Sequence, residues 1–145
     1  MNSPAIRCEE VLRTERTCLE AAREALFRWV QVITSQSIDD VLSLYAADAI
    51  LVPTLSDEIR EREEERRHYF ENFLANGVQA CDILVQKKRV SQKLGTVVIG
   101  GLYTFKFLRA GVESTVPARF LFTFEEIEGR WLITGHHSSR LSENI

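Results

Sequence analysis

The second half of the chain consists of long alternating runs separated by short glycine turns, and this pattern limits the possible folds more than any other feature. Apolar and polar residues alternate over residues 81–90, 96–108, 113–125 and 130–139. Such alternation is typical of strands with one buried face. The dipeptides Ala110-Gly111 and Glu128-Gly129 are typical of two-residue hairpin turns. The pattern predicts an antiparallel sheet, and Gly100-Gly101 predicts a bulge or sharp bend that curves it.

The first half of the chain has helical periodicity instead. Apolar residues recur every three or four positions over residues 7–34, which predicts a long amphipathic helix. A capping-box-like start at Ser37 predicts a second helix that includes Tyr45, and residues 48–52 predict a short strand that ends before a proline. Residues 57–74 predict a third helix, in which the mixed charges of residues 61–67 form a solvated face with ion pairs. Helices followed by strands predict an α+β fold in which a curved antiparallel sheet wraps around the long N-terminal helix.

Size and charge limit the functional class. A chain of 145 residues is expected to form one domain, residues 1–145, with a core at about 7–139. The net charge of −3 and the lack of a basic stripe argue against a nucleic-acid partner. No apolar run is long enough for a membrane span, and the start has no apolar leader. Three widely spaced cysteines fit buried positions in a reducing compartment, so we expect a cytoplasmic protein.

The last predicted strand ends in polar residues, which a strand that only fills a core does not need. Regular alternation would place Leu132, Thr134, His136 and Ser138 on one face, and Trp131, Ile133, His137 and Ser139 on the other. Each face then carries one imidazole and one hydroxyl. Four further polar side chains lie in or beside apolar runs: Thr54, Tyr69, Tyr103 and Arg119. Taken singly, each is explained by a hydrogen bond at the core edge or a surface ion pair, but together they predict a polar site in an apolar pocket.

A metal centre is not expected. A catalytic zinc site needs three protein ligands that converge on one point. The chain has only His68, His136 and His137, of which the last two diverge on a regular strand. No cysteine or carboxylate has a spacing that completes such a set. We therefore expect neither a metal nor another cofactor.

Several segments, in order along the chain, carry a family resemblance. They are Val52-Pro53-Thr54-Leu55-Ser56, Tyr69-Phe70-Glu71-Asn72-Phe73-Leu74, Gly101-Leu102-Tyr103-Thr104-Phe105, Ala118-Arg119-Phe120 and Trp131-Leu132-Ile133 followed by His136-His137-Ser138-Ser139. Over residues 19–139 the chain resembles the association-domain family of calcium/calmodulin-dependent protein kinase II, within the cone-shaped nuclear-transport-factor-2-like and SnoaL-like superfamily. The double histidine-serine ending resembles that of the bacterial and algal iota-class carbonic anhydrases. The charged run after Ser56 and the absence of a proline soon after Ser139 depart from that pattern.

The resemblance implies a cone-shaped sheet and reversible hydration of carbon dioxide to bicarbonate, in some family members without metal. It implies that His136 accepts or orients a proton, and that hydroxyls hold the water or the bicarbonate oxygens. The expected catalytic residues are His136, Ser138, Thr54 and Tyr69, and the expected substrate-binding residues are Tyr103, Arg119, His137 and Ser139. The implied partners are carbon dioxide and bicarbonate, together with a second copy of the chain in a homo-oligomer, for which we favour a dimer.

Two other functions stay open. The domain could be a non-catalytic module for homo-oligomerisation or for binding a small ligand, as in the kinase association domain. It could also be a SnoaL-like or ketosteroid-isomerase-like enzyme that acts on a larger organic ring. That chemistry usually needs an acidic base inside the cone, and none of the apolar strands carries one on the face assigned to the pocket. The pocket volume separates these alternatives, because carbon dioxide needs space for only a few atoms.

Overall fold

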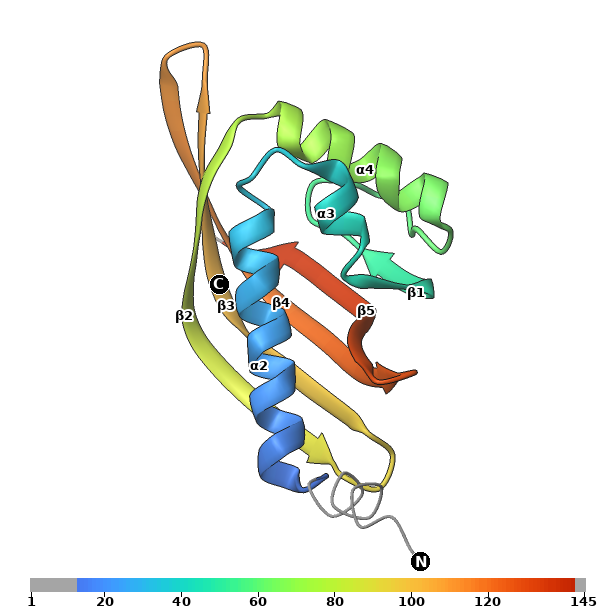
Figure 1. Cartoon of the computed structure of the whole chain (residues 1–145). Helices are drawn as coiled ribbons and strands as arrows, with labels where there is room; N and C mark the ends of the chain where they lie inside the picture. The colour runs from blue at the N-terminus through green and yellow to red at the C-terminus, as the bar shows by residue number, and fades with distance from the viewer. Residues whose placement is uncertain (1–12, 143–145) are drawn as a thin grey trace, which may run out of the picture.

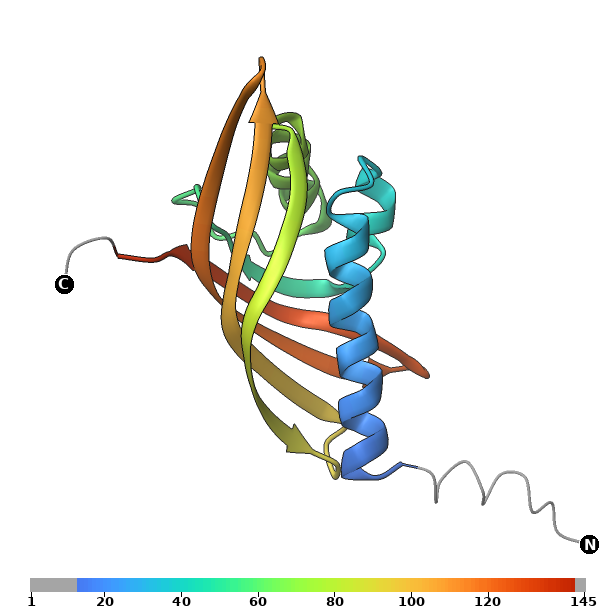
Figure 2. The same ribbon diagram turned by 90° about the vertical axis from the view of Figure 1, so that its left-hand side faces the viewer.

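A computed structural model describes residues 13–142, which form a curved five-stranded sheet with a long helix along its concave side (Figures 1 and 2). The strand order is β1-β5-β4-β3-β2. The elements in chain order are α2 (Glu15–Val32), α3 (Ile38–Leu42), β1 (Tyr45–Val52), α4 (Glu63–Ala75), β2 (Val78–Ser91), β3 (Thr96–Arg109), β4 (Val112–Ile127) and β5 (Arg130–Arg140). The predicted mixed α+β architecture with a curved sheet is confirmed.

One strand pair differs from the predicted antiparallel sheet. Strands β2 to β5 pair antiparallel with their sequence neighbours, as the hairpin turns predict. Strand β1 pairs parallel with β5, with Leu51 opposite His136, so the prediction of a wholly antiparallel sheet was wrong at this edge. The chain leaves β1 through α4 and returns to it only after three more strands, so no hairpin dictates the direction of this pair.

The predicted bend in the sheet has a backbone cause. The register between β2 and β3 shifts between Ile83 and Val85, so Leu84 is an extra residue of β2, and Gly101 of β3 pairs with Gln86 directly after this bulge. A Cβ atom on Gly101 would lie 1.8 Å from the carbonyl oxygen of Val85. Only glycine allows the two backbones to approach this closely, so Gly101 permits the curvature.

The helices begin and end at other residues than predicted. Helix α2 starts after a capping box formed by Thr14 and Thr17, and residues 7–12 of the predicted helix lie outside the described residues. Helix α3 ends at Leu42, and Tyr45 belongs to β1 instead. Helix α4 starts only at Glu63, because residues 53–62 form an irregular segment joined to β1 by a bridge between Leu51 and Arg60.

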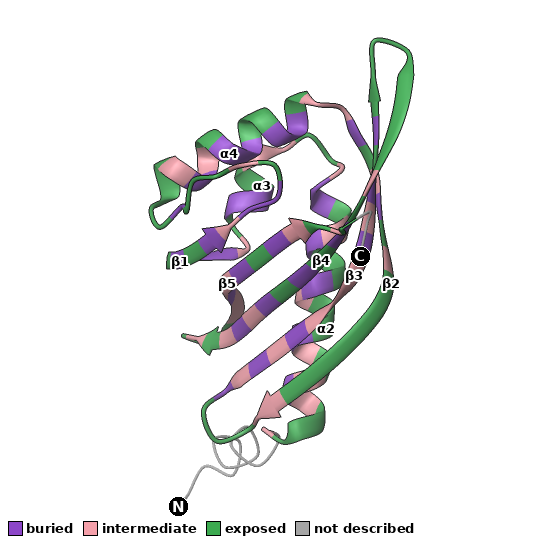
Figure 3. Cartoon of the chain, turned by 180° about the vertical axis from the view of Figure 1, so that it is seen from behind, coloured by how far each residue is buried: buried purple, intermediate pink, exposed green. Residues whose placement is uncertain are grey.

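Aromatic side chains fill the space between α2, α4 and the inner face of the sheet. Buried residues alternate with less buried ones along β4 and β5, as Figure 3 shows by colour. Trp29 of α2 lies edge-on to Phe122, with ring centroids 5.3 Å apart, and stacks at 6.0 Å on Tyr103. Cys18 and Cys81 are free and buried, as predicted, and burial raises the pKa of Cys81 to about 12; Cys8 lies outside the described residues. Within residues 13–142, no helix is long and apolar enough to cross a membrane.

Candidate functional site

Strand β5 contains an irregularity that decides which of its residues enter the core. Gly135 lies opposite Thr123, but Ile133 lies opposite the next residue of β4, so Thr134 is the extra residue. Ile133, His136 and Ser138 are therefore buried together. The prediction that Leu132 and Thr134 share the face of His136 was wrong, because a bulge reverses the alternation of side chains on one side of it.

A small cavity lies where β5, β3, α4 and the segment after β1 meet. Five of the predicted site residues line it: Thr54, Tyr69, Tyr103, His136 and Ser138. The rest of the wall is mostly apolar and consists of Trp29, Leu51, Pro53, Phe70, Phe73 and Phe105. Its volume is about 10 Å³, close to the minimum that a single water molecule needs. The fold thus brings polar groups from distant segments into one enclosed space.

His136 is held between two tyrosine hydroxyls. Its Nδ1 atom lies 2.9 Å from the hydroxyl of Tyr45, and its Nε2 atom lies 3.3 Å from the hydroxyl of Tyr103. The indole Nε1–H of Trp29 donates to the same Tyr45 oxygen at 2.9 Å. The Tyr45 hydrogen is then free to be donated to Nδ1, which assigns the imidazole proton to Nε2. In this tautomer both ring nitrogens of His136 are satisfied.

The hydrogen-bonded chain continues through three further hydroxyl groups. Tyr103 donates to the Oγ atom of Ser138 at 2.6 Å, and Ser138 in turn contacts the hydroxyl of Thr54. The hydroxyl of Tyr69 donates to the main-chain carbonyl of Thr54 at 2.8 Å. A buried polar group without a partner is destabilising, so this connected network fixes the side chains in place. The site is therefore organised before any ligand enters.

Burial keeps this site uncharged at neutral pH. Desolvation, with a smaller effect of the neighbouring His137, lowers the pKa of His136 to about 3. Desolvation also raises the pKa of Tyr69, Tyr103 and Tyr45 well above the usual tyrosine value. A neutral imidazole with a pKa this low is a weak proton acceptor. Its geometry suits it to orienting the tyrosine hydroxyls.

The lowered pKa of His136 predicts an acid-sensitive fold. Above pH 6.5 the imidazole is neutral in both states, and below about pH 3 it is protonated in both. Between these values only the unfolded chain binds the proton, so the free energy of unfolding should fall by up to about 1.4 kcal/mol per pH unit as pH decreases. Urea unfolding should show a weaker loss in His136→Gln than in wild type. The matched control is His68→Gln, at an exposed histidine. An equal acid response in wild type and both variants would contradict the prediction.

Three predicted substrate-binding residues do not reach the cavity. Arg119 and His137 are exposed on the opposite face of the sheet, and Ser139, half-buried there, lies in register with Arg119. Their neighbours Ala118, Phe120, His136 and Ser138 are the residues that face inward. The fold therefore does not bring Arg119, His137 and Ser139 together with the residues that line this cavity, because adjacent strand residues point to opposite faces.

Sequence reasoning missed Trp29 and Tyr45 as partners of His136. Trp29 lies in the apolar stripe of α2, where it looks like an ordinary core residue, and Tyr45 was assigned to the end of a helix. The residue types of Trp29 and Tyr45 could have pointed to this role, because indole N–H and phenol O–H groups in a core need hydrogen-bond partners. Among residues 13–142, no group of three or more histidine, cysteine or acidic side chains is placed to hold a metal ion.

Comparison with known proteins shows what the chain is similar to. Residues 22–142 match the model of the calcium/calmodulin dependent protein kinase II association domain. A crystal structure from Xanthomonas campestris, provisionally described as such an association domain, is 35% identical, with 84% of this chain and 87% of that chain covered and a TM-score of 0.78. No curated protein matches the sequence.

Two more distant structures show the same fold. An ntf2-like protein with a cystatin-like fold from Novosphingobium aromaticivorans is 13% identical, with 99% of this chain and 92% of that chain covered and a TM-score of 0.74. A ketosteroid isomerase-like protein from Erwinia carotovora atroseptica is 15% identical, with 86% and 96% covered and a TM-score of 0.70. At such identities the likeness extends to the fold, and function has to be argued from the site.

Proposed function

We propose a function for this protein, which belongs to the calcium/calmodulin dependent protein kinase II association domain family. In this proposal, it catalyses the metal-independent, reversible hydration of carbon dioxide to bicarbonate in the cavity. The observation that carries the proposal is the enclosed chain of hydroxyls around a neutral His136. The finer resemblance to iota-class carbonic anhydrases rests on the ending His136-His137-Ser138-Ser139, of which His136 and Ser138 belong to the hydrogen-bonded network. The cavity has room for about one water molecule, so admitting carbon dioxide requires a much smaller movement of its wall than admitting an organic ring does.

The uncharged site favours a proton relay over a single strong base. In the step that we propose, the oxygen of a water molecule forms a bond to carbon, and one C=O electron pair moves to its oxygen. The water proton passes to the hydroxyl pair of Ser138 and Thr54, which gives a proton to the carbon dioxide oxygen and is regenerated. The product is carbonic acid, which releases its proton to solvent and becomes bicarbonate. Tyr103 donates to the Ser138 oxygen and holds it in place, and His136 orients the Tyr103 hydroxyl.

The test is a stopped-flow indicator assay of carbon dioxide hydration on protein dialysed against a strong chelator. We expect activity that survives dialysis. We also expect little change in rate between about pH 6 and 9, because none of the cavity side chains with a shifted pKa titrates in that range. Tyr69→Phe removes the hydrogen bond to the Thr54 carbonyl, so it should lower the rate about tenfold or more. A silent wild-type protein would refute the enzymatic proposal.

Self-association is the second candidate function. The outer face of the sheet exposes Ile50 and Leu121 beside a shallow hollow of about 200 Å³, whose lining also includes Val52 and His137. Exposed apolar surface of this kind is typical of protein–protein contacts, and the family is described as an association domain. If the hydration assay is silent, a non-catalytic homo-oligomer becomes the favoured function.

A ketosteroid-isomerase-like reaction ranks third. The structural neighbours include proteins of that kind, so the fold is compatible with it. The residues that line the cavity include no carboxylate, and the cavity is too small for a ring substrate. This alternative needs both a different base and a much larger pocket.

A further inference from the structure

The irregular segment of residues 53–62 closes one side of the cavity. It joins β1 to α4 without helix or strand and contributes Pro53 and Thr54 to the cavity wall. Leu55, the next residue, has a positive φ of 66°, which is uncommon for a residue with a side chain. The cavity of about 10 Å³ has room for about one water molecule. Any larger occupant, carbon dioxide included, therefore requires part of the wall to move.

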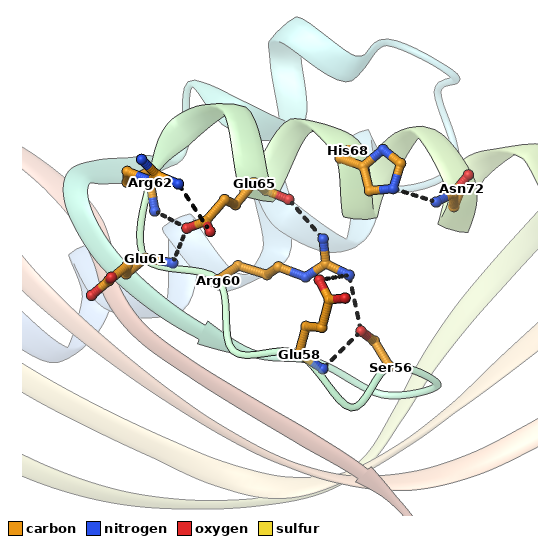
Figure 4. Close-up of polar contacts among 8 residues, drawn as sticks. All are labelled: Ser56, Glu58, Arg60, Glu61, Arg62, Glu65, His68 and Asn72. Carbon is orange, nitrogen blue, oxygen red and sulfur yellow. Dashed lines mark hydrogen bonds and ion pairs between the residues drawn. The ribbon is translucent and has the colours of Figure 1, made fainter.

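Arg60 ties this segment to α4 (Figure 4). Its guanidinium donates to the hydroxyl of Ser56 at 3.0 Å and to the main-chain carbonyl of Glu65 at 3.3 Å. Its main chain exchanges two hydrogen bonds of 2.8 Å with Leu51, a residue of the cavity wall. The Arg60 side chain thus connects the middle of the segment to the first turn of α4, and the Arg60 main chain connects both to the end of β1. The planar fork of an arginine can bridge two acceptors in this way, and a lysine ammonium cannot reproduce the geometry.

Arg60 also contacts the cavity wall from behind. Its guanidinium carbon lies 5.8 Å from the centre of the Tyr69 ring, within cation–π range. The residue is only 7% exposed, and its buried Nε atom has no hydrogen-bond partner. The carboxylate of Glu58, 3.6 Å away, is mostly exposed. A buried cation held chiefly by a hydroxyl and a carbonyl is costly, which indicates a role beyond a surface ion pair.

From these contacts we infer that Arg60 is a positioning residue for the cavity: it fastens residues 53–59 over the opening and thereby holds the Thr54 hydroxyl against Ser138. When the guanidinium releases Ser56, the segment can swing outward and admit a small molecule. When it binds again, the hydroxyl relay is complete. The inference concerns access to the cavity and depends on the proposed function only for the identity of the molecule that enters.

Fluorescence quenching of Trp29 measures this access without reference to catalysis. The chain has two tryptophans, and Trp131→Phe leaves Trp29, in the cavity wall, as the only indole. In that background we compare acrylamide quenching in the parent, Arg60→Met and Arg60→Lys. The matched control is Arg62→Met, because Arg62 is exposed and forms ion pairs with Glu64 and Glu65, neither of which lines the cavity. The quenching constant should rise several-fold in both Arg60 variants and stay unchanged in the control.

The quenching results distinguish a positioning role of Arg60 from an effect of its charge alone and from a general loss of stability. Recovery of the parent value in Arg60→Lys would overturn the inference, since it would show that charge alone suffices. An unchanged constant in Arg60→Met, or an equal rise in Arg62→Met, would overturn it as well. If Arg60→Met does not fold, Ser56→Ala removes one anchor of the guanidinium and should give a smaller rise. If the protein lacked hydration activity but showed this quenching pattern, the proposed function would be refuted and the positioning role of Arg60 would stand.

Discussion

His136→Phe is expected to lower kcat/KM for carbon dioxide hydration by about a hundredfold or more, because it removes the group that orients the hydroxyl relay. The imidazole stacks on Phe122 with ring centroids 3.9 Å apart, so a phenyl ring can keep most of the packing. It cannot bond to Tyr45 or Tyr103, which leaves two buried hydroxyls each short of one partner. The measurement is stopped-flow hydration on protein whose circular dichroism matches that of wild type.

The next residue along the chain provides the control. His137 is exposed on the outer face of the sheet, opposite Leu121. His137→Phe should leave the hydration rate unchanged, because it alters no group in the cavity. Equal losses of hydration rate in the two variants would contradict the assignment of the active site to the cavity, since they would show that residues on both faces of β5 affect the rate equally. If His136→Phe kept full activity, the relay mechanism would be wrong.

Arg66→Met is expected to lower the free energy of unfolding by about 3 kcal/mol, although Arg66 lies in a highly charged helix. The side chain is 1% exposed. Its guanidinium donates to the main-chain carbonyl of Ala49 at 2.7 Å and to those of Ala46 and Ala47 at 3.1 Å each. The pairing of β1 with β5 is irregular between Tyr45 and Ile50, so these carbonyls depend on Arg66 for a partner.

The adjacent arginine is the matched control for this prediction. Arg67 forms a 2.9 Å ion pair with Asp39, and the Arg67 side chain is partly exposed while that of Asp39 is largely exposed. Arg67→Met should change the free energy of unfolding by less than about 1 kcal/mol, as is usual for surface ion pairs. Both variants can be measured by urea unfolding at neutral pH. A loss in Arg66→Met no larger than that in Arg67→Met would show that the carbonyls find other partners.

The charged run of residues 61–67 shows that helical periodicity alone does not predict which charged side chains are buried. The interpretation of residues 61–67 as a solvated helix face is confirmed for Glu64, which is exposed in the first turn of α4 and forms an ion pair with Arg62. It was wrong for Arg66, which is buried. Periodicity assigns a residue to a helix face, but it does not reveal that a strand with unpaired carbonyls packs against that face. Burial of an arginine depends on partners far away in the sequence.

Local sequence patterns and glycine positions were enough to predict the order of helices and strands, the hairpin turns, the bend near Gly101 and the family. They also placed His136 and Ser138 on one face of their strand. The folded chain was needed to show that this face points inward and that β1 runs parallel to β5. It was also needed to show that Trp29 and Tyr45 contact the site and that Arg60 packs behind it. Those facts follow from strand register and from contacts between distant segments, which no local pattern specifies.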